Sequence, residues 1–588
     1  MWTFSSSITT KTVEYLHDSY DYIVVGGGNA GCVLARRLSE NGGNSVLLVE
    51  RGDAGDGWLH RTPLPSLHQF SDGKHSSVLE SAHNTQLGRL SALVTGLGLG
   101  GSTRINGGQY TCGIPAQYNS WNQAVVDRED WSYSDIKQFF KKSETFVGPV
   151  PREFHGLDGP LKVGSSENFN FECAEKTFEA ARNIGFSCIE DLRSPLAPCT
   201  GVNKMHFTVA SDGTRQSAYR AYLPKKFVNA MCDTLHICTK TLARKLYSST
   251  SKDSLNVDTV ELQDIGNGQI RRISVKKEVI LACGALRTPQ LLFLSGIGPR
   301  RDLEAQNISV VKDLPGVGQH LQDHLLLPVS FYCPLYDSLW AMIRRPHVLL
   351  TQLYQYLRHG KGWFLCTMVE TEIFGSSKCI QPDGTPTPLT GSQLDSSDPK
   401  NLPDFSVMSC CIADPRGENI DQSRGFLGLN AALLQTKSSG RVQLSSTDPN
   451  SNPHCEMNYL DSPEDWKALR AALRVAVRLA EEMRASGYPI EDIPNRVPES
   501  LDDDTLNKYI RENADTMFHY SSTCRMAPED ADSPGVVNDE LRVHGLTNLR
   551  ICDASVFPDV PATHPQALVY AFAEKCAAMI LEAKLDAC

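Results

Sequence analysis

The sequence predicts an α/β protein in which a dinucleotide-binding domain with a parallel sheet is joined to a second domain of helices and strands. One observation is the stretch DYIVVGGGNAGCVLARRLSENGGNSVLLVERGD at residues 21–53, which has the order strand, glycine turn, helix, strand. A second is the length of 588 residues, which allows more than one domain. A third is an amphipathic helix at 462–487, with Ser462 as its cap and Gly487 as its stop, inside the segment 326–500 that we expect to form the second domain.

The glycine turn has the spacing that a phosphate-binding loop needs. Residues 22–25 form a short apolar run, typical of a parallel strand that is buried on both faces. Gly26, Gly28 and Gly31 follow at GxGxxG spacing. The first allows the turn, the second lets backbone amides approach a pyrophosphate, and the third lets helix and strand pack closely. A lone GxGxxG is weak evidence, but one that stands between a strand and a helix indicates a Rossmann-like domain.

The helix after the glycines and the acid after the next strand complete this motif. We expect a helix over residues 30–40, so Asn29 and Ala30 stand where free N–H groups and a positive dipole end would face the phosphates. Glu50 closes the second strand. A carboxylate there accepts hydrogen bonds from a ribose 2′-hydroxyl and repels a 2′-phosphate, which disfavours NADP. The motif alone does not separate NAD from FAD.

Later segments of the chain carry a more specific pattern. Together with the glycine motif, and in the same order along nearly the whole chain, they resemble the glucose-methanol-choline (GMC) oxidoreductase family of FAD enzymes. The segments are GLGLGGSTRINGGQYTCG (96–113), DGTRQSAYRAYL (212–223), GALRTPQLLFLSGIG (284–298), PGVGQHLQDH (315–324), SSGRVQLSSTDPNSNPHCEMNYL (438–460), MFHYSSTCRMAP (517–528), LRVHGLTNLRICDASVFP (541–558) and DVPATHPQALVYAFAEKC (559–576).

The resemblance implies a Rossmann-like FAD-binding domain with an inserted α+β substrate domain that carries a largely antiparallel sheet. It assigns residues 14–165, 212–325 and 501–588 to the FAD-binding domain, and 166–211 and 326–500 to the substrate-binding domain.

The resemblance also implies further cofactor contacts. Asn106 matches the side chain nearest the flavin, and Ala243 matches a strand position whose backbone meets the adenine. Asp553 matches a residue near the ribityl and pyrophosphate groups, although an Asp that caps a helix is an alternative. Besides the three glycines, Asn29, Ala30 and Glu50, the residues assigned to FAD are Ser102, Asn106, Ala243, Asp553, Ala554, Pro565 and Gln566.

Two histidines near the end of the chain are the candidate catalytic residues. Alcohol oxidation needs a base within hydrogen-bond distance of the hydroxyl, and a neutral imidazole suits that role at cellular pH. His519 matches the family's catalytic histidine. His564 matches its second member, which is His or Asn in relatives, and both types can donate a hydrogen bond to a developing alkoxide. Pro565 is expected at the first position of an amphipathic final helix, whereas His155 and His324 are expected to be structural.

The chain departs from the family's pattern beside Asn106 and again beside His519. The covalent flavin link of some relatives uses a histidine just before the Asn, and this chain has Ile105 there. We therefore predict non-covalent FAD. Relatives often have Pro and Gly where this chain has Tyr520 and Ser522, and Tyr520 is expected to reshape the pocket.

Composition excludes several classes of partner. The net charge is −11 and no basic block longer than short pairs occurs, which argues against nucleic acid and anionic membranes. The eighteen cysteines include no CxxC pair, so we predict no metal site. No run approaches the roughly 20 apolar residues of a membrane span, and the N-terminus lacks the regions of a signal peptide. We therefore expect a cytoplasmic protein. A homodimer is the oligomeric state that we consider.

The function predicted on this basis is FAD-dependent oxidation of an alcohol to a carbonyl, by hydride transfer to flavin N5 with a histidine base. Small to medium neutral alcohols of natural-product (secondary) or aromatic alcohol metabolism are the expected substrates, with O2 or another acceptor reoxidising the flavin. The alternative is lyase or other non-redox chemistry on the same fold, with FAD as a structural cofactor. A flavin-binding protein without catalysis is a third reading.

Overall fold

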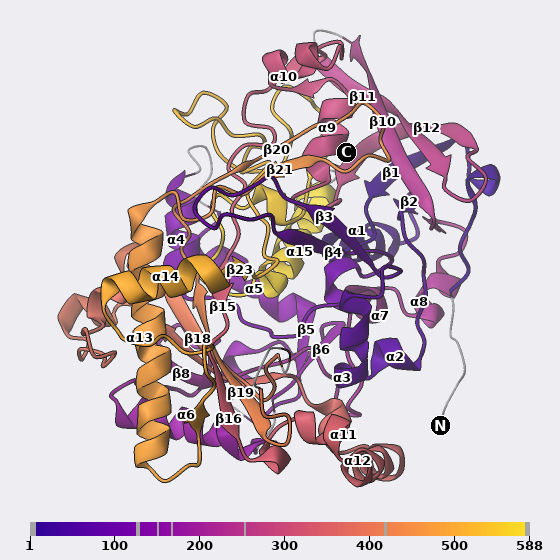
Figure 1. Ribbon diagram of the computed structural model, residues 1–588. Coiled ribbons are helices and arrows are strands. Elements are labelled where there is room, and N and C mark those ends of the chain that lie inside the picture. The colour runs from indigo at the N-terminus through magenta and orange to yellow at the C-terminus, as the bar shows by residue number, and fades with distance from the viewer. Residues whose placement is uncertain are drawn as a thin grey trace.

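The computed structural model describes residues 8–124, 130–149, 152–165, 168–251, 254–414, 416 and 420–582, which form two large β-sheets, four two-stranded sheets and the helices packed on them (Figure 1). Three predictions involve residues outside these ranges. The predicted domain boundary at 165/166 lies at the edge of a gap, and residues 583–588 of the predicted FAD-binding domain are not described. The first seven residues, which enter the prediction of a cytoplasmic location, are also not described. None of the helices in the described ranges has the length and apolar content of a membrane span.

The first sheet has seven strands and a parallel centre, as predicted for a Rossmann-like domain. Strand β1 pairs in parallel with β12 on one side and β2 on the other, and β9 continues the parallel part beyond β2. β24 also pairs in parallel with β12, whereas β10 and β11 add an antiparallel edge. The strands are β1 (Ser19–Val25), β2 (Val46–Val49), β9 (Leu235–Cys238), β10 (Thr241–Ser251), β11 (Ser254–Asp264), β12 (Ile270–Leu281) and β24 (Leu549–Ile551).

Burial explains why these residues form this sheet. All four residues of β2 and the last four of β1 are buried, which is typical of parallel strands covered on both faces. Helix α1 (Asn29–Ser39) follows the glycine turn and packs against α15 (Gln566–Glu582) and α7 (Ala218–Tyr222). The predicted helix over 30–40 therefore exists, shifted by one residue.

The final helix differs from its prediction. Every residue of α15 from Gln566 to Ala577 is buried, so this helix lies in the core rather than showing one apolar face. The carboxylate of Glu574 is fully buried. It forms an ion pair with Arg37 at 2.7 Å and accepts a hydrogen bond from the Tyr222 hydroxyl at 2.9 Å. Pro565 precedes the helix instead of opening it, and its carbonyl accepts the Val569 N–H.

The second sheet has nine strands and is largely antiparallel, as predicted. Among the strands that the structure describes in this sheet, only β7 and β8 pair in parallel. Helices α6 (Glu172–Asn183) and α13 (Pro463–Ala485) pack against it, and the predicted helix at 462–487 corresponds to α13. The strands are β7 (Cys188–Ile189), β8 (Gly201–Lys204), β15 (Leu325–Leu327), β16 (Ser330–Cys333), β17 (Val369–Gly375), β18 (Phe405–Cys410), β19 (Gly425–Leu433), β22 (Glu491–Asp492) and β23 (Asp515–Thr516).

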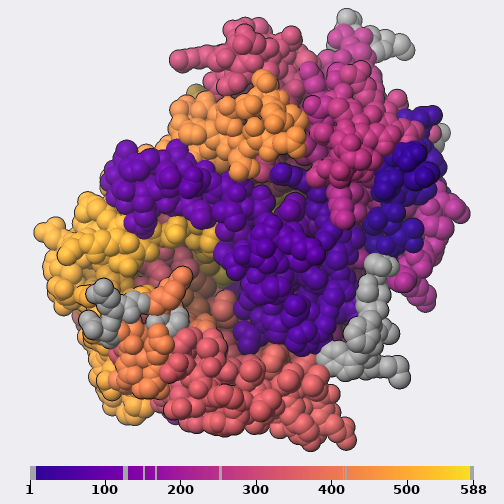
Figure 2. All heavy atoms as spheres, turned by 45° about the vertical axis from the view of Figure 1, so that its right-hand side comes forward, coloured from indigo at the N-terminus to yellow at the C-terminus, as the bar shows by residue number. Residues whose placement is uncertain are grey.

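The remaining elements surround the two sheets. Figure 2 shows early segments (purple) covering the middle of one face, between α11–α12 below and the β20–β21 region above. The helices are α2 (Trp58–Arg61), α3 (Pro63–Ser66), α4 (Pro115–Ala124), α5 (Tyr133–Ser143), α8 (Lys225–Ala230), α9 (Thr288–Leu294), α10 (Arg300–Ala305), α11 (Trp340–Arg344), α12 (Pro346–His359) and α14 (Asp503–Asn513). The strand pairs are β3–β4 (Ser76–Glu80, Ala92–Gly96), β5–β6 (Glu144–Phe146, Leu161–Val163), β13–β14 (Ile297–Gly298, Lys312–Asp313) and β20–β21 (Arg441–Gln443, His454–Glu456).

Candidate active site

The glycine turn between β1 and α1 has no room for side chains where the sequence places Gly26 and Gly31. Gly26 has φ +107°, and a Cβ on it would lie 2.2 Å from the Ala282 carbonyl oxygen. A Cβ on Gly31 would lie 1.8 Å from the Gly26 carbonyl oxygen, so this glycine lets helix and strand meet. At Gly28 the nearest atom to such a Cβ is 4.0 Å away. The turn is therefore closed on its protein side and open beside Gly28, as a phosphate cradle requires.

Glu50 lies directly after β2 and organises this turn. Its Oε2 accepts the Gly27 N–H at 2.8 Å, and its Oε1 accepts the N–H groups of Gly52 at 2.7 Å and Gly98 at 3.0 Å. The carboxylate thus joins the first glycine turn to the second glycine-rich segment. The start of β10 is also here, because the Thr241 N–H donates to the Glu50 carbonyl, and Ala243 lies two residues further on.

Three predicted cofactor residues meet in one hydrogen-bonded group. Asn29 donates from Nδ2 to the Gln566 carbonyl at 3.0 Å, and Asn106 donates from Nδ2 to the Gln566 side-chain oxygen. Arg215 donates to Asn106 Oδ1 at 2.6 Å. Asn29 Oδ1 and Gln566 Nε2 are buried and have no partner within the described ranges. Orphaned polar atoms beside a glycine cradle fit a polar cofactor such as FAD, which these residues would hold.

The other predicted cofactor residues are placed as follows. Asp553 caps the short helix η10 (Ala554–Val556) by accepting the Ser555 N–H, and its other oxygen accepts the Gly284 N–H and the Thr288 hydroxyl. The capping role considered for Asp553 is therefore present, and its cofactor role stays a prediction. Ser102 is exposed and accepts the Gly96 N–H at 3.1 Å.

The two candidate catalytic histidines lie side by side. The ring centroids of His519 and His564 are 5.3 Å apart and the rings are nearly perpendicular, at 85°. His519 is half-buried and follows Phe518, which has φ +63°, a value uncommon for residues other than glycine. His564 is buried and lies two residues before α15 begins. Residues 45 positions apart in the sequence thus form one pair.

Asp323 fixes the backbone beneath His519. Its Oδ1 accepts the His519 N–H at 2.6 Å, and its Oδ2 accepts the hydroxyls of Tyr459 at 2.6 Å and Thr516 at 2.5 Å. Burial raises the pKa of this carboxyl to about 7, although these hydrogen bonds act in the opposite direction. Tyr520 was expected to reshape the pocket, but it is buried in the core with its hydroxyl 3.4 Å from Thr516 Oγ1.

A third imidazole contacts the ring of His519. His324 Nδ1 lies 2.9 Å from His519 Nδ1, so one ring must donate to the other. When His519 Nδ1–H is the donor, His519 Nε2 keeps a free lone pair, which is the tautomer that a general base needs.

Glu372 on β17 holds the second ring of the pair. The carboxylate Oε2 lies 3.1 Å from His564 Nε2, and Glu372 is fully buried. This contact fixes the orientation of the His564 ring and leaves Nδ1 as the nitrogen that is not engaged by Glu372.

The environment of the cluster disfavours positive charge. Burial, followed by the neighbouring His324 and His564, lowers the pKa of His519 well below its usual 6.5. Burial and His564 lower the pKa of His324 to about 3. His519 is therefore neutral and able to accept a proton over a wide pH range.

Sequence reasoning missed three residues of this cluster. His324 was expected to be structural, and Asp323 and Glu372 were not singled out. Asp323 and His324 end the segment PGVGQHLQDH, which was a usable signal, and Glu372 is an acidic residue within a wholly buried strand. The partners of these residues come from distant segments, which no local pattern reveals.

Comparison with known proteins identifies the family. GMC oxidoreductase N-terminal and C-terminal family models match residues 20–326 and 436–573. The chain is 32% identical over 571 residues to an oxygen-dependent choline dehydrogenase of Pseudomonas fluorescens (strain Pf0-1), covering 96% of this chain and 94% of the relative. It is also 32% identical over 565 residues to an oxygen-dependent choline dehydrogenase of Serratia proteamaculans (strain 568), covering 95% of each.

Solved structures share the fold at lower identity. A formate oxidase variant from Aspergillus oryzae RIB40 has a TM-score of 0.83 and 24% identity, covering 97% of this chain and 99% of the other. Pyridoxine 4-oxidase from Mesorbium loti has a TM-score of 0.78 and 24% identity, covering 95% and 98%. The chain belongs to the GMC oxidoreductase family and is an FAD-dependent alcohol oxidoreductase.

Proposed function

We propose that this protein oxidises a small to medium neutral alcohol to a carbonyl compound, with His519 as the base and His564 as the hydrogen-bond donor to the developing alkoxide. The observation that carries the proposal is the His519–His564 pair, with ring centroids 5.3 Å apart, next to the start of α15, where Gln566 Nε2 has no partner among the described residues.

The chain's own groups divide the work of proton removal. FAD supplies the hydride acceptor when it is bound. The alcohol hydroxyl would donate to the free Nε2 lone pair of His519, whose backbone is held by Asp323. His564 would stabilise the oxygen as it loses its proton by donating from Nδ1–H while its Nε2–H donates to the Glu372 carboxylate, which requires the doubly protonated ring. The buried surroundings keep His519 and His324 neutral until the proton arrives.

The finer assignments rest on the same site. Ile105, which precedes Asn106, has no nucleophile, which supports non-covalent FAD. Acid precipitation of the protein tests this point, because dissociable flavin stays in the supernatant. The two relatives described above are oxygen-dependent dehydrogenases, which favours oxygen as the electron acceptor here. A role in natural-product or aromatic alcohol metabolism, a cytoplasmic location and a homodimer stay predictions.

Anaerobic flavin reduction is the deciding experiment. The holoenzyme is mixed without oxygen with choline, short aliphatic alcohols and aromatic alcohols, and loss of the oxidised-flavin absorbance is followed. Bleaching by an alcohol supports the proposal, and rapid recovery in air identifies oxygen as the acceptor. Turnover of a substrate without bleaching would instead support the lyase alternative, and a chain that binds FAD but reacts with no member of a wide panel would support binding without catalysis.

A further inference from the structure

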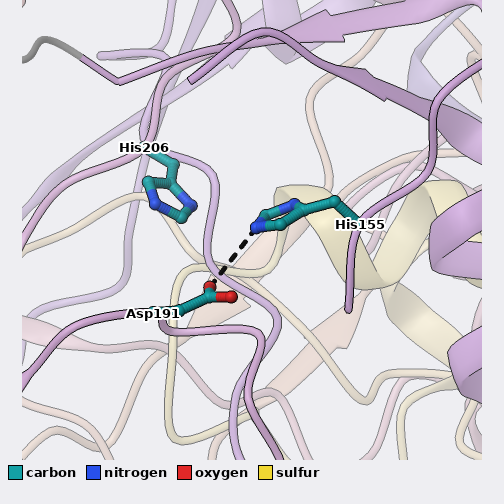
Figure 3. A group of neighbouring side chains, drawn as sticks. All are labelled: His155, Asp191 and His206. Carbon is teal, nitrogen blue, oxygen red and sulfur yellow. Dashed lines mark ion pairs between the residues drawn. The ribbon is translucent and has the colours of Figure 1, made fainter. Parts of the chain in front are cut away.

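A cluster of buried ligand-type side chains lies outside the active site. His155, Asp191 and His206 come from three separate loops, and one ligand atom from each lies within 4.8 Å of the others. Figure 3 shows the three side chains converging on one point. All three are buried, with exposed fractions of 4%, 7% and 2%. The mechanism proposed above uses none of them.

Each of the three side chains keeps one atom without a hydrogen-bond partner in the described part of the chain. These atoms are His155 Nε2, Asp191 Oδ2 and His206 Nδ1. His155 Nε2 lies 3.3 Å from Asp191 Oδ1 as an ion-pair contact only (Figure 3). A buried polar atom without a partner costs about 1–3 kcal/mol. Three such atoms in one buried cluster therefore indicate a missing occupant.

The other atoms of these side chains are held by neighbouring groups. His155 Nδ1 lies 3.1 Å from Glu144 Oε1, so Nδ1–H donates to a carboxylate and Nε2 is left as the lone pair. Asp191 Oδ1 accepts the Arg193 N–H at 2.8 Å, which directs Oδ2 away from that contact. When one nitrogen of an imidazole binds a metal ion, the N–H of the other nitrogen commonly donates to a carboxylate.

Carboxylates lie at both ring nitrogens of His155, because Nδ1 is 3.1 Å from Glu144 Oε1 and Nε2 is 3.3 Å from Asp191 Oδ1. The Arg193 guanidinium lies 3.1 Å from Glu144 Oε1. A divalent ion at this point would take the place of a proton between the His155 ring and Asp191. Two imidazoles and one carboxylate with water as the fourth ligand form a set that zinc accepts.

We propose that His155 Nε2, the Asp191 carboxylate and His206 Nδ1 bind a divalent transition metal ion, with zinc as the best match. The ion joins the loop after η4 (Arg152–Phe154), the loop after β7 and the loop after β8. Because the His206 carbonyl also accepts the Tyr110 N–H at 2.8 Å, the ion stabilises the segment that follows Asn106. The role is structural, and it revises the prediction that the chain has no metal site.

Metal analysis of the tag-free holoenzyme, purified from zinc-supplemented medium, tests the proposal directly. We expect about one zinc ion per chain and a fall of several degrees in the unfolding midpoint after chelation. Replacement by Co²⁺ should produce visible absorption bands to the red of the flavin bands. His206→Gln should lower the metal content to below about a tenth of an ion per chain, whereas His454→Gln, a partly exposed histidine elsewhere on the surface, should leave it unchanged.

The decisive measurement is on the wild-type protein, so it does not depend on the folding of a variant. Zinc-supplemented holoenzyme that carries less than about a tenth of an ion, and whose unfolding midpoint responds neither to chelator nor to added Zn²⁺ or Co²⁺, would overturn the proposal. The cluster would then hold an ordered water, which its spacing also fits. Equal metal content in His206→Gln and wild type would overturn the assignment of the ligands.

Discussion

Replacing His519 with asparagine should remove most of the catalytic power while leaving the fold intact. Asparagine keeps a hydrogen-bonding side chain but cannot accept a proton, so the lone pair left free by the His519–His324 contact is lost. General-base catalysis contributes about 10²- to 10⁴-fold, which corresponds to about 3–5 kcal/mol of barrier. The measurement is the rate of anaerobic flavin reduction by stopped flow, with the best alcohol of the panel. FAD content should match the wild type, because this residue is not assigned to the cofactor.

The matched control is His564→Asn in the same pair of rings. Asparagine there still donates a hydrogen bond, so its rate should fall less than about tenfold. In the wild type, kcat/KM should fall only on the acid side of pH 6.5, because the pKa of His519 is lowered and the base stays deprotonated until the solution becomes more acidic. The acid limb should vanish in His519→Asn. Equal losses in the two variants, or a wild-type midpoint above pH 6.5, would refute the assignment of the base.

Three further predictions follow from the same geometry. Glu372→Gln should slow flavin reduction by about 5- to 30-fold at unchanged FAD content, since a carboxylate accepts about twice as strongly as a neutral amide; an unchanged rate would count against it. Gly31→Ala should lower the unfolding midpoint and FAD retention because its Cβ meets the Gly26 carbonyl at 1.8 Å, whereas Gly43→Ala, with open space around it, should change neither. Asp323 has a folded pKa of about 7 against a usual 3.8, so its contribution to stability is present below pH 4 and is lost as the pH rises through 7. Relative to Asp323→Asn, the wild type should therefore lose about 2–3 kcal/mol between pH 5 and pH 8, and a constant difference between their unfolding curves would contradict this.

The nucleotide-binding half of the fold could be predicted because its constraints are local. Gly26 and Gly31 are required by backbone contacts within a few residues or with the adjacent strand, and the helix that follows Gly28 begins within one residue of its predicted start. The final helix was harder, because its sequence suggests one apolar face. Its charged residues Glu574 and Lys575 are buried by partners that lie hundreds of residues away, such as Arg37. Periodicity alone cannot reveal such tertiary pairing.

The catalytic pair was predicted by resemblance, and the supporting groups were not. Glu372 reaches His564 from the middle of β17, and its strand neighbours give no sign of an imidazole nearby. His155 was likewise expected to be structural and His206 was not singled out; the two stand 51 residues apart in the sequence. In both cases the chemistry depends on side chains that only the folded chain brings together.

Strand register sets the geometry of the imidazole cluster. β15 pairs antiparallel with β23, with Leu325 opposite Thr516, and the Met517 N–H donates to the His324 carbonyl at 2.9 Å. This pairing brings His324 beside the loop that carries His519. Because successive residues of a strand point to opposite faces, a slip of one residue would turn His324 away from His519. The contact between His324 and the base is therefore a consequence of how two short strands of the second sheet align, so the surroundings of His519 are set partly outside the parallel sheet.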